Sequence, residues 1–141
     1  MTYKTCEKGI YELIKTLAST NVFAMRAPDN QAGPFIIFQR VDRDNLTKNT
    51  LNRTAGVAGV VQAVIQIDAY AAGYYDAKEL GASIEFLLDG YSGTVYHGED
   101  SPQDFVEIGG ITLQNDGDII DQTDQPLLFR NSATYLVTYK Q

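Results

Sequence analysis

Residues 115–124, NDGDIIDQTD, carry aspartates at a spacing similar to that of a divalent-cation loop. Hard cations such as Ca²⁺ and Mg²⁺ bind several oxygen ligands, which Asp116, Asp118, Asp121 and Asp124 could supply. An EF-hand loop beginning at Asp116 needs glycine at position 121 and glutamate at its twelfth place, and this sequence has neither. We therefore expect an acidic, solvated turn at residues 115–118. A weak Ca²⁺ or Mg²⁺ site at Asp116, Asp118 and Asp121 is the alternative.

Other side chains that could do chemistry occur without the neighbours that such chemistry needs. His97 is the only histidine, so a Ser/His triad would have to use it, and we favour a solvated residue at a strand end. The pairs Tyr11/Lys15 and Tyr74/Lys78 match a spacing found in some reductases, but no GxGxxG fingerprint accompanies either pair. The GxxxxGK[ST], HExxH and GxSxG motifs do not occur in the chain.

Cys6 is the only cysteine, so the sequence offers neither a disulfide framework nor a thiolate metal cluster. It falls on the apolar face of a predicted helix, which favours a buried packing role over a reactive thiol. We predict a protein that is not an enzyme and has no cofactor. A small hydrolase or isomerase that uses Asp116, Asp118 or His97 is the alternative from another class.

The length and composition fit one soluble globular domain. The chain has 141 residues, of which 44% are hydrophobic and 21% charged. No apolar run approaches the ~20 residues that a membrane helix needs, and charges interrupt the first 17 residues, so we expect no membrane contact and no secretion signal. These features predict a protein made in a cytosol.

The charge is unevenly distributed along the sequence. Residues 1–53 contain eight Lys or Arg and five Asp or Glu, whereas residues 54–141 contain three basic and thirteen acidic residues. The formal net charge of the whole chain is -7. Affinity for nucleic acid comes from clustered basic residues, so the acidic second part argues against a role in reading DNA.

The elements that must position these residues are organised around residues 60–89. From residue 61 the sequence alternates as in a strand with one buried face, formed by Val61, Ala63, Ile65, Ile67 and Ala69. After a short break the period becomes helical, with an apolar stripe of Ala77, Leu80, Gly81, Ile84, Leu87 and Leu88. The link is too short to carry the helix away, so the helix must fold back onto the apolar face of the sheet.

The remaining segments complete one layer of sheet and one of helices. An N-terminal helix is predicted from Cys6, Ile10, Leu13, Ile14 and Leu17, with Thr2 or Thr5 as its N-cap. Strands are predicted at 21–25, at 35–41 with both faces at least partly covered, at 94–97, at 105–113 and at 132–140. The expected fold class is α+β, a mostly antiparallel or mixed sheet with two helices packed on one face.

Residues 42–59, DRDNLTKNTLNRTAGVAG, have neither helical nor strand period. Long irregular segments in compact domains are usually functional or disordered. We expect a mobile loop at about residues 43–59. One interpretation is a plain hairpin connection, and the other is an arm that binds a partner through Arg43, Lys48 and Arg53.

Three segments in this order, PFIIFQRV at 34–41, VIQIDAYAAGYYDAKELGASIEFLLDG at 64–90 and FRNSATYLVTYK at 129–140, carry a resemblance. The chain resembles the tail completion or tail terminator family of long-tailed bacteriophages and related gene transfer agents. In that family a helix precedes a Pro-aromatic-aliphatic strand, and a strand ending in Asp-x-Tyr or Asp-x-Trp runs into a helix. The residues that match this pattern best are Ile67, Asp68, Ala69 and Tyr70 with Tyr75, Asp76 and Ala77.

The resemblance implies that residues 1–141 form a single tail-terminator-like domain with a structural role in the virion tail or neck. Such a protein is a homo-oligomer, a hexameric ring that caps the tail tube protein, stops its polymerisation and joins the head through a connector or stopper protein. DNA would pass through an acidic lumen without specific binding, and assembly would occur in the bacterial host cytoplasm. A head-side connector or stopper of the neck is the alternative within this class, and a monomeric binding module the alternative outside it.

Overall fold

The computed structural model describes residues 6–17, 21–26, 34–45, 60–96, 104–121 and 128–140. Along the chain one helix precedes three strands, and a second helix precedes three more, which is the predicted order. They are α1 (Cys6–Ile14), β1 (Asn21–Ala24), β2 (Phe35–Asn45), β3 (Val60–Ala71), α2 (Tyr74–Leu88), β4 (Gly93–Tyr96), β5 (Phe105–Asp121) and β6 (Leu128–Lys140).

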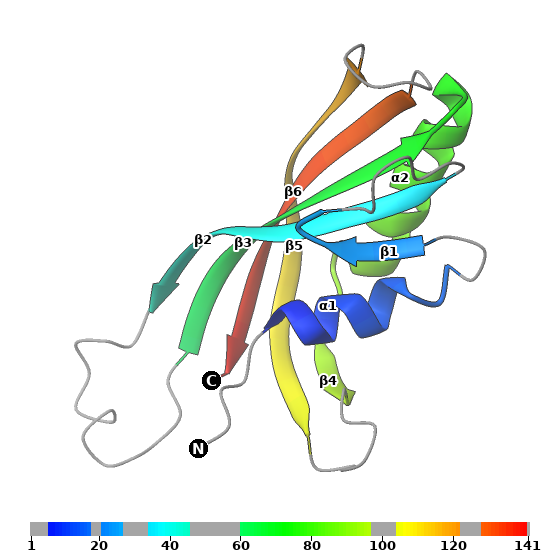
Figure 1. The fold of residues 1–141 in the computed structure, drawn as a ribbon. Helices are drawn as coiled ribbons and strands as arrows, with labels where there is room; N and C mark the ends of the chain where they lie inside the picture. The colour runs from blue at the N-terminus through cyan, green and yellow to red at the C-terminus, as the bar shows by residue number, and fades with distance from the viewer. Residues whose placement is uncertain are drawn as a thin grey trace, which may run out of the picture.

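All six strands form one twisted sheet in the order β1-β2-β3-β6-β5-β4 (Figure 1). The pair β1 and β2 is parallel, and every other pair is antiparallel. The long strands β3 and β6 lie at the centre and pair along their whole length, from Val60 opposite Lys140 to Ala71 opposite Phe129. The predicted α+β class, with a mixed and mostly antiparallel sheet, is confirmed.

The predicted apolar face of β3 is buried against α2. Alternate residues from Val61 to Ala69 are at most 2% exposed, and α2 contacts β3, β5 and β6. On the helix, Ala77, Ile84 and Leu88 are buried, as the helical spacing predicts. Only Ala72 and Gly73 separate β3 from α2, so the helix returns directly onto the strand that precedes it.

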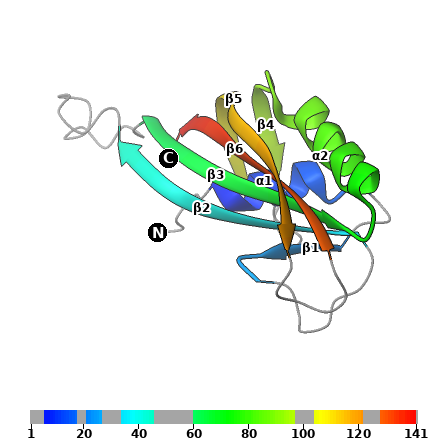
Figure 2. The ribbon, with the colours of Figure 1, turned by 90° about the horizontal axis from the view of Figure 1, so that it is seen from above.

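The helix α1 covers another part of the same face. Its residues Cys6, Ile10 and Ile14 are fully buried and belong to one cluster with the inner residues of α2 and the sheet. A Cβ on Gly9 would lie 2.6 Å from Val106 Cγ1, so glycine permits the close approach of α1 to β5. Seen from above, the strands form a curved layer with α2 along one side (Figure 2). The prediction of two helices on one face is confirmed, whereas Thr2 and Thr5 lie outside the described residues.

Three expected strand boundaries are wrong, and one of them is the start of β6, which lies at Leu128 and not at Ser132. The strand β2 does not end at Val41 but continues to Asn45, after a register shift between Arg40 and Asp42. The expected turn at 115–118 is part of β5, which continues through a register shift between Leu113 and Asn115. In β2 and β5 the long antiparallel partner strand provides ladder hydrogen bonds that outweigh the local turn preference of Asn, Asp and Gly.

Neither α1 nor α2 is long and apolar enough to cross a membrane, and no other described segment is helical.

Substitution Ile65→Ala should lower the free energy of unfolding by about 2–5 kcal/mol, because Ile65 is fully buried at the centre of the helix-covered face. Urea denaturation followed by circular dichroism measures this change. The control Val64→Ala alters the preceding residue, which is partly exposed on the opposite face of the sheet. It should lower the free energy of unfolding by less. Equal losses in the two variants would contradict the assignment of the faces.

Candidate functional site

The acidic residues singled out in the sequence lie along β5. Asp116 is exposed and stands opposite Ala133 of β6, while Asp118 and Asp121 stand opposite Asn131 and Leu128. The side chains of Asp118 and Asp121, and all of Asp124, lie outside what the structure describes. Within the described part of the chain, no group of three or more His, Cys, Asp or Glu side chains is placed to hold a metal ion. The metal site therefore stays a prediction.

Asp116 lines a cavity of about 250 Å³ between α2 and the strands β5 and β6. Gly81 allows the helix to lie close to β6 here, because a Cβ on Gly81 would come within 2.7 Å of the Asn131 side-chain carbon Cγ. Asn131 itself is only 9% exposed. The cavity is lined by Lys78, Gly81, Ala82, Glu85, Leu113, Asp116, Asn131, Ala133 and Tyr135.

Negative charge gathers around the buried tyrosine of this cavity. Tyr135 is 1% exposed, and this burial is the main cause that raises the pKa of its hydroxyl above the usual value of 10. The negative charges of Glu85, Asp89 and Asp116 raise the pKa further. The Lys78 ammonium lies 5.2 Å from the centre of the Tyr74 ring. The oxygens of the cavity can accept hydrogen bonds from an amine or a guanidinium group.

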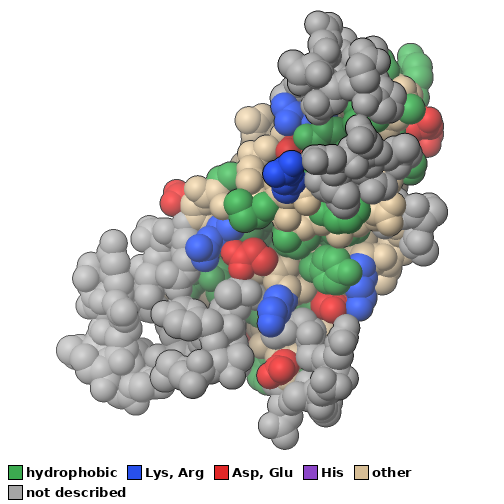
Figure 3. Space-filling view, viewed as in Figure 1, with side chains coloured by type: hydrophobic (Ala, Val, Ile, Leu, Met, Phe, Trp, Pro, Cys, Tyr) green, Lys and Arg blue, Asp and Glu red, His purple; other side chains and the backbone are tan. Residues whose placement is uncertain are grey.

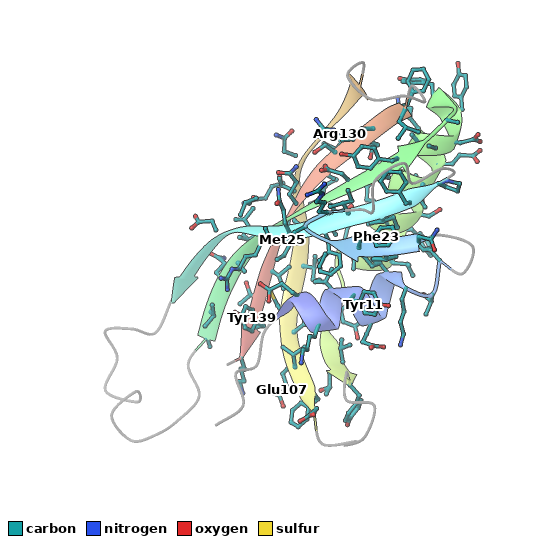
Figure 4. The ribbon with its side chains drawn as sticks, viewed as in Figure 1. Tyr11, Phe23, Met25, Glu107, Arg130 and Tyr139 are labelled. Atoms are coloured by element: carbon teal, nitrogen blue, oxygen red, sulfur yellow. The ribbon has the colours of Figure 1, made fainter. Side chains whose placement is uncertain are left out.

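A second group lies on the sheet face that the helices leave uncovered. The rings of Phe35 and Tyr70 stack with centroids 4.7 Å apart and an interplanar angle of 9°, and Phe23 meets Phe35 edge-on at 6.4 Å. Arg130 donates a hydrogen bond of 3.3 Å from Nη1 to the Tyr70 hydroxyl. Leu128 is buried in the same cluster, and Figure 4 labels Phe23 and Arg130 at its edges.

The sequence anticipated only part of this second group. The prediction that strand 35–41 is at least partly covered on both faces is confirmed at its start, because Phe35, Ile36 and Phe38 are all buried. The participation of Tyr70 and Arg130 was missed. The register of β3 and β6 places Tyr70 opposite Arg130, so both side chains lie on one face of the sheet. That register is the signal that could have revealed their contact.

The other candidate residues are separate from both groups. Cys6 is fully buried, which confirms its packing role. Lys15 forms an ion pair with Glu12 on α1. Arg43 lies on β2 opposite Ala63, and the positions outside the described residues are His97, Lys48 and Arg53.

The comparisons with known proteins add a structural likeness. No family model matches the sequence, and no curated protein matches it either. A chain of a solved structure described as the virion of a native gene transfer agent particle has a similar fold, with a TM-score of 0.57 and 17% sequence identity. The similarity covers 92% of this chain and 85% of that chain.

The raised pKa of Tyr135 predicts a loss of stability at alkaline pH. Above pH 10 the unfolded chain releases the Tyr135 proton while the folded chain retains it, so the unfolded state binds fewer protons. The contribution of Tyr135 to the free energy of unfolding should be fully present below pH 10. Above pH 10 the free energy of unfolding should fall by up to about 1.4 kcal/mol per pH unit. Chemical denaturation at pH 9 to 11 measures the slope, which Tyr135→Phe should reduce. The control Tyr75→Phe changes an exposed tyrosine and should leave the slope unaltered.

Proposed function

We propose that this chain is a structural virion protein: a tail terminator whose copies form a ring, most simply a hexamer, on the end of a tail tube. The observation that carries the proposal is the similarity of fold to a chain of a gene transfer agent virion over 92% of the present chain. The order of the three segments at 34–41, 64–90 and 129–140, which resembles the tail terminator family, supports the same role.

The fold suits a subunit that works through its surfaces. Its edge strands β1 and β4 have four residues each, whereas the central strands β3 and β6 have 12 and 13. A ring requires a heterologous contact, in which two different patches of one subunit meet on its neighbours. The ring would then offer one end to the tail tube protein and the other to a connector or stopper protein of the head.

The charge of the chain supports a passive passage for DNA. Each copy carries a net charge of -7, so a ring of identical copies is strongly acidic. If part of this charge faces the lumen, DNA phosphates are repelled there and DNA passes without specific binding. This role requires no catalysis, no cofactor and no membrane.

Particles assembled without this protein test the role. Electron microscopy should show tails of excess length or tails without heads, because nothing ends polymerisation of the tube. Filled heads beside unattached tails of normal length would instead indicate a connector or stopper on the head side. Particles of normal appearance and infectivity would reject both roles.

Basic residues of the segment 43–59 are proposed to bind the tube or the connector. The double variant Lys48→Glu with Arg53→Glu should fold normally and lose at least ~10-fold in particle joining, because two charges of the arm change sign. Infectivity together with thermal unfolding measures the two properties. The double variant Lys8→Glu with Lys78→Glu makes the same charge change on α1 and α2 and serves as control. Equal joining in both double variants would contradict this role of the arm.

A further inference from the structure

The large hydrophobic side chains that are exposed fall into two groups on different elements. Among the described residues, one group is Tyr11 on α1, Met25 just after β1 and Val41 on β2. On α2 they are Tyr74, Tyr75 and Phe86, and Tyr96 of β4 stands apart from both. Figure 3 shows apolar side chains among charged ones on the face that carries α1. Exposed apolar groups rimmed by charge are typical of protein contact sites.

Met25 is the most unusual residue of the first group. Its φ of 66° lies in the left-handed region, which costs about 1–2 kcal/mol for a residue with a Cβ. Its backbone N–H donates a 2.9 Å hydrogen bond to the Phe38 carbonyl, which fixes this conformation at the end of β1. The side chain is nevertheless 73% exposed, and the next residue, Arg26, is exposed as well. We call Met25 and Arg26 the knob.

The surroundings of the knob connect it to α1. Tyr11 packs against Phe38 with ring centroids 6.2 Å apart, so Tyr11 and Met25 both adjoin Phe38. Figure 4 labels Met25 and Tyr11 on the face of the molecule that α1 and β1 form. Arg40, two residues further along β2, pairs with Glu7 of α1 at 3.5 Å.

Phe86 of the second group lines an open groove between α2 and Leu17, which follows α1. Tyr75, Glu79, Ala82 and Phe86 recur at helical spacing and are all exposed, on the side of the helix opposite buried Ile84. Phe86 is 89% exposed. The groove has a volume of about 560 Å³ and is lined by Leu17, Glu79, Ala82, Ser83, Phe86 and Leu87. We call it the Phe86 groove, and among the described residues that line it Glu79 carries the charge.

We propose that the knob of one copy of this chain docks in the Phe86 groove of the next copy. Met25 enters the apolar groove beside Phe86, and Arg26 pairs with Glu79 at its rim. An unbranched methionine adapts its shape to an irregular apolar surface, and an arginine matches the single carboxylate of the groove. The inference rests on the proposed ring, because it names the two patches that would meet at each contact.

Charge favours this head-to-tail arrangement over a two-fold dimer. If each patch met its own copy, Arg26 would face Arg26 and Glu79 would face Glu79. Juxtaposed like charges are costly at an interface, whereas the heterologous contact places Arg26 against Glu79. Because the knob and the groove lie on different elements, the contact repeats from copy to copy and closes into a ring if the rotation permits.

Two variants with one intact patch each test the contact. Met25→Asp keeps the groove, and Phe86→Asp keeps the knob. Aspartate adopts the left-handed region more readily than methionine, so Met25→Asp should not impair folding. Sedimentation velocity over a range of concentrations should show assembly of the unaltered protein and at least a ~30-fold weaker self-association of each variant, as for a residue that anchors an interface. An equimolar mixture should form a 1:1 dimer that grows no further.

Matched variants complete the experiment. Tyr96→Asp changes a residue that is 62% exposed outside both patches, and it should assemble like the unaltered chain. Arg26→Glu and Glu79→Arg should each weaken assembly, and the double variant that carries both should recover at least ~5-fold of the loss.

The outcomes separate this inference from the proposed function. Assembly of both aspartate variants at the unaltered strength would overturn the docking contact and leave the ring standing. A mixture that stays monomeric, or no recovery in the charge exchange, would also overturn it. An unaltered protein that is monomeric at all concentrations would overturn the contact, whereas the terminator role is judged separately by tail length in particles made without the protein.

Discussion

The two-residue link between β3 and α2 constrains the rest of the structure. Ala72 and Gly73 leave the helix no route except back across the sheet, so the inner side chains of β3 are buried by the helix that follows them. The sheet must then extend on both sides of β3, with β2 on one side and β6 on the other. The helix α1 fills the part of the inner face that α2 does not cover, and the larger core cluster joins the two helices.

The periodic parts of this arrangement could be predicted from the sequence. The alternation in 61–69 and the helical spacing from Ala77 to Leu88 each reflect a local constraint, because the apolar residues of one segment must all lie on its buried face. The strand limits could not be predicted, because they depend on partners distant in sequence. Asn115 to Asp118 has turn composition, yet β6 pairs with it beyond the irregularity at Leu113. The strand β2 likewise continues past its shift at Arg40 because β3 pairs with it.

The sites were harder to predict than the elements. The acidic stretch drew attention to Asp116, but its cavity exists only because α2 crosses β6 where Gly81 meets Asn131, fifty residues later in the chain. No local pattern encodes that meeting. The pairing of Tyr70 with Arg130 has the same origin, since a register fixed by the whole length of β3 and β6 places the two side chains opposite each other.

Met25 contributes little to the stability of one subunit but suits a contact in the proposed assembly. In a single copy its left-handed backbone costs free energy, and its largely exposed side chain recovers little by burial. Glycine or asparagine would adopt the same conformation with less strain. Phe86 is 89% exposed, so its side chain also contributes little burial to a single copy. In the proposed contact a second copy would bury both residues, and the hydrophobic stabilisation would then arise between subunits. A surface that gives the monomer no advantage is what assembly by repetition of one contact requires.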